Sequence, residues 1–166
     1  MRYLIIGLGA VAIAAGASAQ NAGSNWAYFE PEDGPMQAGV VNAKGEQLIL
    51  KCDKPGNKSV YAVVVTPEPL VPPQRDPYVL PTEVRFDENA PTEDRWRYYD
   101  NSAVAIDMRG QQALTRFMRG LPNASKLRVR MNVERGRTIE VNFDVAGASE
   151  AIKRVYESCQ DDAPIS

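Results

Sequence analysis

The sequence predicts a single α+β domain, in which a twisted antiparallel β-sheet is covered by two α-helices and closed by one disulfide. Short stretches of alternating apolar and polar residues, separated by turn residues, recur along most of the chain. Only residues 107–121 and a last segment, which begins at Ala148 or Ser149 and reaches Cys159, carry apolar side chains at helical spacing in the mature chain. The chain has two cysteines, Cys52 and Cys159, behind an apparent export signal, and such a pair is most simply a disulfide.

The first 19 residues have the three-part layout of a secretory signal peptide. Arg2 supplies a positive charge, residues 4–15 are apolar and uncharged, and residues 17–19 read Ala-Ser-Ala, as signal peptidase prefers. The apolar stretch is shorter than the roughly 20 residues that span a bilayer. We expect cleavage near Ala19 and a periplasmic or secreted mature chain without a membrane span. An uncleaved N-terminal anchor is the alternative.

The rest of the chain suits one domain over residues 26–160, with a disordered N-terminus at 20–25 and a disordered tail at 161–166. The whole sequence has 19 basic and 21 acidic side chains, for a formal net charge of −2. This balance argues against a dedicated nucleic-acid or anionic-membrane binder.

The first part of the domain predicts four short strands separated by turns. Leu48, Leu50 and Cys52 share one face of their strand. The last strand is β-branched and apolar on both faces, which indicates a central position in the sheet. The expected strands cover residues 26–29, 36–41, 46–52 and 60–66.

Residues 66–82 hold six of the twelve prolines, because proline stands at 67, 69, 72, 73, 77 and 81. Proline cannot donate to a strand ladder, so we expect an extended surface loop. A loop of this length is either functional or a stiff crossover between two parts of the sheet.

The middle of the chain predicts strands at 83–87, 95–99 and 103–106, followed by a helix. Asp107 is expected to cap this helix, which runs through Leu121. Its apolar stripe is Ala113, Leu114, Phe117 and Leu121.

Residues 126–133 and 137–145 predict a hairpin with a three-residue loop at 134–136. Only this loop length places both apolar rows on one face, and it sets Arg130 opposite Glu140. The last helix then presents Ile152, Val155, Tyr156 and Cys159 to the core. Cys159 and Cys52 therefore both face inward, as a disulfide between them requires.

Recognisable catalytic chemistry is missing from the sequence. There is no histidine, and we find no phosphate-binding or calcium-binding loop motif. Four acids, Asp87, Glu88, Glu93 and Asp94, suit either a solvated turn or a Ca²⁺ or acid/base site. We therefore assign no catalytic residue, no metal and no cofactor.

The segment 95–99 combines arginine with aromatic residues. Arg95, Arg97 and Tyr99 share one face of the expected strand, and Trp96 and Tyr98 share the other. Aromatic and arginine side chains together bind glycans or extended peptides. The alternative is that the aromatic pair belongs to the core and the arginines are ordinary surface residues.

The second half also carries a set of short segments in a recognisable order: Val84-Arg85-Phe86-Asp87, Trp96, a helix ending at Leu121, Leu127-Arg128-Val129-Arg130, Phe143-Asp144-Val145-Ala146-Gly147, Ala151-Ile152 and Cys159. This layout resembles the VasI/TagO type of type VI secretion accessory protein and related small periplasmic domains. The resemblance implies a shared fold and an exported accessory role, and it carries over no functional residue.

The sequence thus favours an exported, non-enzymatic binding or accessory protein whose partner is a protein or a cell-envelope polymer. Such a protein acts through surface contacts, for which Arg95, Arg97 and Tyr99 are the candidate residues. The alternative is a carboxylate-dependent cell-envelope hydrolase or glycan-processing enzyme. Two converging carboxylates in a pocket, one of them buried, would favour the enzyme.

Overall fold

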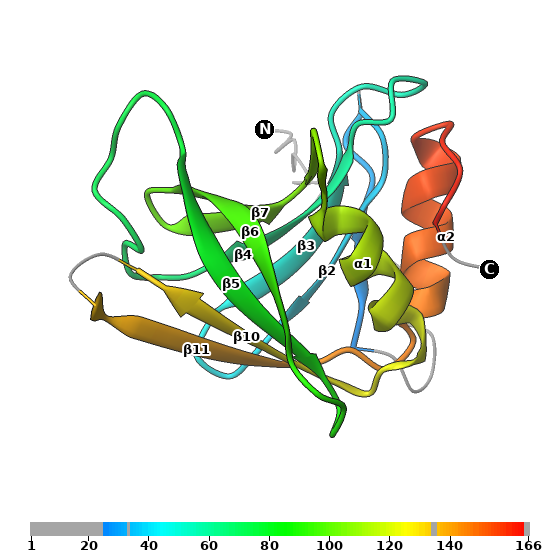
Figure 1. Ribbon diagram of the computed structural model, residues 1–166. Helices are drawn as coiled ribbons and strands as arrows, with labels where there is room; N and C mark the ends of the chain where they lie inside the picture. Colours follow the sequence, from blue (N-terminus) through cyan, green and yellow to red (C-terminus); the bar gives the residue numbers. More distant parts are fainter. Residues whose placement is uncertain (1–24, 33, 134–135, 165–166) are drawn as a thin grey trace, which may run out of the picture.

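Nine antiparallel strands form one sheet in the order β1-β2-β3-β4-β7-β6-β5-β10-β11 (Figure 1). The computed structural model describes residues 25–32, 34–133 and 136–164. The signal peptide, most of the segment 20–25, hairpin-loop residues 134–135 and the end of the tail lie outside this range. The strands of the sheet are β1 Ala27–Phe29, β2 Gln37–Val41, β3 Gln47–Cys52, β4 Val60–Val65, β5 Tyr78–Phe86, β6 Thr92–Tyr99, β7 Ser102–Ala105, β10 Lys126–Asn132 and β11 Thr138–Asp144.

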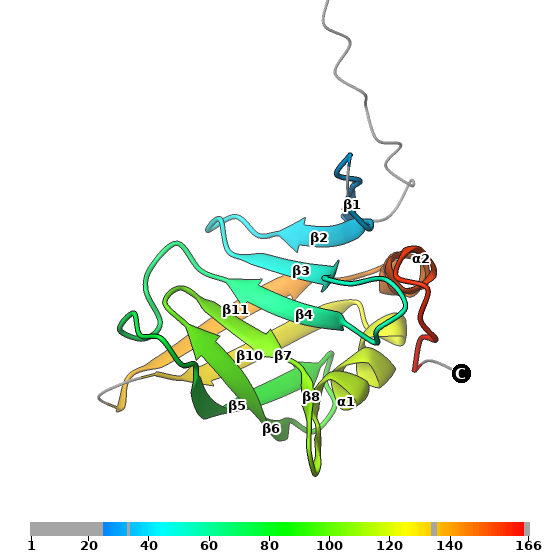
Figure 2. The same ribbon diagram turned by 90° about the horizontal axis from the view of Figure 1, so that it is seen from above.

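The sheet is strongly curled, so that its two ends approach each other (Figure 2). The Asn42 side chain, in the β2–β3 turn, donates to the backbone oxygen of Asn142 on β11 at 3.1 Å. Near the first strand, the Trp26 indole donates to the backbone oxygen of Val145 at 3.2 Å. The concave face of the sheet encloses the hydrophobic core.

Two helices cover the concave side of the sheet. Helix α1, Ala113–Gly120, packs against β6 and β7, and helix α2, Ala148–Ser158, packs against β2 and β3. The ring of Phe117 on α1 meets Trp96 edge-on at 5.5 Å between centroids. A short 3-10 turn, η1 at Leu121–Asn123, joins α1 to β10. The predicted α+β class, with two helices on an antiparallel sheet, is confirmed.

The predicted disulfide is also confirmed. Cys52 at the end of β3 bonds Cys159 at the C-cap of α2, with the two Cα atoms 5.8 Å apart. The stripe of Ile152, Val155 and Tyr156 is buried beside it. Alternation on β3 and helical periodicity on α2 were therefore enough to place both sulfur atoms in the core.

The hairpin of β10 and β11 has the predicted register. Arg130 lies opposite Glu140, and Lys126 lies opposite Asp144. Gly136 has a φ of 70°, the left-handed conformation expected at the end of the three-residue loop.

Three element boundaries differ by three residues or more from the sequence-based expectation, and the smallest change is that β6 begins at Thr92 and so includes Glu93 and Asp94 of the expected acidic turn. The helix predicted from Asp107 begins only at Ala113, because the intervening residues form a small hairpin of β8, Asp107–Met108, and β9, Gln111–Gln112. Asp107 still caps the helix, but from a distance: its carboxylate accepts the backbone N–H of Thr115 at 3.0 Å.

The proline-rich segment 66–82 is the third difference, because β5 already begins at Tyr78 and includes Pro81. Pro81 pairs with Arg95 of β6, whereas the pairing of β5 with β10 ends at Thr82. With a neighbour on only one side, the strand tolerates a residue that has no N–H. The remaining loop carries the chain from β4 past β7 and β6 to β5, and is thus a crossover.

Candidate binding surfaces

The three predicted surface residues lie on the outer, convex face of β6. Arg95 and Tyr99 are exposed and Arg97 is half-buried, whereas Trp96 and Tyr98 are 1% and 0% exposed in the core. The Tyr98 hydroxyl forms a 2.6 Å hydrogen bond with Thr82. Of the two interpretations of this strand, the core position is therefore correct for Trp96 and Tyr98. Arg95, Arg97 and Tyr99 lie on the outer face, where a partner can reach them.

The guanidinium groups of this surface have no acidic partner among the described residues. Arg95 donates to the backbone oxygen of Val79 at 2.8 Å, and neither Arg95 nor Arg97 forms an ion pair with a described residue. Arg97 is flanked across the sheet by Val79 on β5 and Val104 on β7. Val104 in turn pairs with Val63, which is only 7% exposed. The surface therefore combines unpaired positive charge with an apolar row, and we call Arg95, Arg97 and Tyr99 the outer-face surface.

The proline-rich loop borders a cleft of about 620 Å³. Leu70 and Val71 are buried, and their N–H groups donate to the Asp100 backbone oxygen at 2.6 and 3.1 Å. Arg137 closes the other side by donating to the Pro69 oxygen at 3.1 Å. Asp100 lines the cleft and directly follows Tyr99. The cleft at the proline-rich loop therefore adjoins the outer-face surface.

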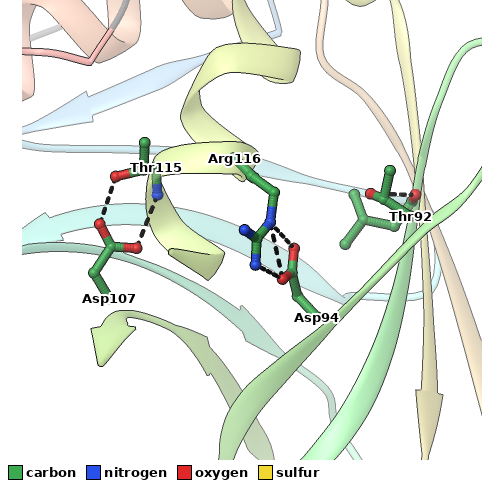
Figure 3. A network of polar contacts seen from close by, with 6 residues as sticks. Thr92, Asp94, Asp107, Thr115 and Arg116 are labelled. Atoms are coloured by element: carbon green, nitrogen blue, oxygen red, sulfur yellow. Dashed lines mark hydrogen bonds and ion pairs between the residues drawn. The ribbon is translucent and has the colours of Figure 1, made fainter. Parts of the chain in front are cut away.

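The four acids of the predicted acidic turn have separate positions. Asp94 is 8% exposed, and both its oxygens accept from Arg116 Nε at 3.0 Å (Figure 3). Asp87 accepts the backbone N–H groups of Ser125 and Lys126 at 3.0 and 2.8 Å.

The two glutamates, Glu88 in the turn and Glu93 on β6, lie at the surface. Glu88 forms an ion pair with Arg85 at 2.8 Å, and Glu93 is exposed. The described residues contain no cluster of three metal-ligating side chains. The four acids thus stabilise the fold or face solvent, and they do not converge on a pocket.

A second cleft, of about 380 Å³, lies between the start of α1 and the end of α2 and was not predicted from the sequence. Three carboxylates line it: Asp107, Asp161 and Asp162. The sequence predicts a disordered tail at 161–166, whereas the Asp161 N–H donates to the Tyr156 backbone oxygen at 3.1 Å. Ala163 of the same tail packs against the core. The only sequence signal was the adjacent acid pair just after the helix.

Tyr156 on α2 also lines this cleft and is 4% exposed. Burial raises the pKa of its phenol, and the charges of Asp161 and Asp107 raise it further. The tyrosine is therefore a neutral phenol beside carboxylates that are half-buried or exposed.

No protein-family model and no curated protein sequence matched the chain. Among solved structures, the fold is similar to invasion associated protein B from Bartonella henselae, with a TM-score of 0.52 and 14% sequence identity. The match covers 81% of this chain and 93% of that chain. This likeness shows the fold alone, and no comparison supports the resemblance to the VasI/TagO type specifically. None of the described helices has the length and hydropathy to cross a membrane.

Proposed function

We propose that the chain is exported and acts in the periplasm, or outside the cell, as a non-enzymatic binding or accessory protein. The signal pattern of residues 1–19 and the Cys52–Cys159 disulfide support export, because disulfides persist in oxidising compartments. The partner is a protein or a cell-envelope polymer that carries negative charge.

The observation that carries this proposal is the outer-face surface. Two guanidinium groups that form no ion pair with a described residue lie beside the half-exposed ring of Tyr99, on a strand inside the sheet. Arginine and tyrosine are among the residues enriched at binding hot spots, and side chains on a strand need little backbone ordering when a partner binds. An acidic group of the partner would replace water at the two guanidinium groups while an apolar part covers the neighbouring valines.

The alternative, a carboxylate-dependent hydrolase, has less support. In the sequence, the hydrolase was suggested by the four acids between residues 87 and 94. Asp94 is the buried one among them, and its negative charge is paired with Arg116. The carboxylates of the second cleft are half-buried or exposed, which is not the environment that keeps a general acid protonated.

The test uses the mature chain and a variant with Arg95→Ala, Arg97→Ala and Tyr99→Ala. The matched control, Arg128→Ala with Arg130→Ala, removes two arginines from the outer face of β10 instead. Capture of partners from periplasmic extract and co-sedimentation with purified cell wall should fall about tenfold or more for the outer-face variant only. Melting temperatures should stay close to that of the parent chain.

Equal capture by both variants removes this surface from the proposal. Turnover of a cell-wall substrate that a single carboxylate substitution abolishes would overturn the non-enzymatic function altogether.

A further inference from the structure

We propose that the cleft between α1 and α2 binds a primary ammonium group carried on an aliphatic chain. This site is separate from the outer-face surface, and its failure would leave the proposal above standing. Its rim holds Asp107, Asp161 and Asp162, against a single lysine, Lys58. None of these acids forms an ion pair with a described residue.

The carboxylates keep acceptor capacity for a ligand. Asp161 Oδ1 accepts the backbone N–H of Asp162 at 2.9 Å, and no described hydrogen bond reaches its other oxygen. The Asp162 carboxylate has no described hydrogen-bond partner. Asp107 is occupied by Thr115, which holds it in place as a fixed negative charge at the rim (Figure 3).

Tyr156 is the second, independent indication of a ligand. It is 4% exposed and lines the cleft, yet its hydroxyl has no hydrogen bond with any described residue. The hydroxyl oxygen is not among the fully buried, unpartnered polar atoms of the described residues, so it is open to the cleft, where a donor of a ligand can reach it. An ammonium group has three N–H donors and no acceptor, so it can serve the phenol oxygen and two carboxylates together.

Helix α2 adds to the negative potential. Its C-terminal end lies at the cleft, and its last turn contains no basic residue. The C-terminal end of a helix carries partial negative charge and favours cations.

The apolar part of the cleft lining indicates that the ligand carries an aliphatic chain next to its ammonium group. Val60, Ile106 and Leu114 line the same cleft and suit methylene groups. The described residues offer no metal-binding cluster, and the volume of about 380 Å³ is within the usual range for small organic ligands. An alkyl-ammonium group therefore fits both the charge and the lining, whether it comes from a free diamine or from a lysine-type side chain of a peptide.

The experiment titrates the isotope-labelled mature chain and follows its amide NMR signals. The probes are 1,5-diaminopentane, Nα-acetyl-lysine amide and, as the uncharged match, 1,5-pentanediol. Saturable shifts at Thr115, Asp161 and Asp162 are expected with an amine and not with the diol. Added salt should weaken the binding. Tighter binding of the diamine points to a free polyamine as the source, and tighter binding of the lysine derivative points to a peptide.

Variants locate the site. Asp161→Asn with Asp162→Asn should weaken amine binding about tenfold or more, because it removes charge-assisted hydrogen bonds. Glu88→Gln with Glu93→Gln removes the same charge elsewhere and should leave binding unchanged. Tyr156→Phe should weaken binding by a smaller factor and keeps the ring in the core. The absence of saturation, equal shifts with the diol, or equal loss in both double variants would overturn the proposal.

Discussion

Replacement of Gly120 by alanine tests the packing between α1 and the sheet. Gly120 ends α1 with a φ of −80° and ψ of −33°, so its backbone is right-handed and available to any residue. On helix propensity alone, alanine should stabilise the chain by up to about 1 kcal/mol. The structure predicts the opposite sign, because a β-carbon here would lie 3.0 Å from Phe86 Cζ and closer still to two other ring carbons.

The magnitude follows from what the Phe86 ring can do. It also packs against Phe117, at 5.7 Å between centroids, so it cannot move freely away from the helix. Overpacking of this kind costs about 1–3 kcal/mol. After the propensity gain is subtracted, we expect a net loss of about 1–2 kcal/mol in the free energy of unfolding. For a domain of this size, the melting temperature should fall by about 2–4 °C per kcal/mol.

Urea unfolding, followed by the fluorescence of the buried Trp26 and Trp96, measures this loss. The same substitution in a Phe86→Leu background separates the two effects, because the smaller side chain removes the clash. In the Phe86→Leu background, Gly120→Ala should leave the free energy of unfolding unchanged or raise it. The interaction energy between the two substitutions should be about 1 kcal/mol or more. If Gly120→Ala stabilises the parent chain, the described contact between α1 and β5 is wrong.

Two further predictions concern the covalent link and the buried phenols. Replacement of Cys52 and Cys159 by serine should lower the free energy of unfolding by about 4–5 kcal/mol, since their disulfide closes a sequence separation of 107 residues; free thiols in the unreduced, denatured parent chain would contradict the link. Burial raises the pKa of Tyr98 to about 12, and burial with a hydrogen bond to Asp53 raises that of Tyr61 to about 12. Because the folded pKa values exceed the ordinary 10.0, the stability from these two residues is full below pH 10 and is lost as the pH rises toward 12. A loss of tyrosinate absorbance near pH 10 on introducing Tyr61→Phe and Tyr98→Phe into the folded chain would contradict this, because one of the two phenols would then ionise there.

Local periodicity was sufficient for much of the fold. In the β10–β11 hairpin, two apolar rows and one glycine determine the register, because a one-residue slip would expose every core side chain. The disulfide was predictable for a similar reason: the faces of Cys52 and Cys159 follow from their neighbours. Strand order was not predictable, since the insertion of β7 between β4 and β6 depends on how distant hairpins dock.

The sites were less accessible to sequence reasoning. The outer-face residues could be proposed because alternation alone places Arg95 and Arg97 together. The cleft between α1 and α2 could not be predicted from the sequence. Asp107 and Asp161 are more than fifty positions apart and come together only when α1 and α2 are packed. The small β8–β9 hairpin was missed as well, since Asp107 is a good capping residue wherever the helix begins.

The position of the disulfide has a consequence for synthesis. Cys159 follows every described strand and helix, whereas Cys52 ends the third strand. During synthesis or translocation, Cys52 must therefore remain an unpaired thiol until almost all of the described chain has emerged. A fragment that stops before Cys159 keeps that lone thiol, and in an oxidising compartment it is expected to accumulate as cross-linked dimers or mixed disulfides. Fragments released too early can thus be told from the finished monomer on a non-reducing gel.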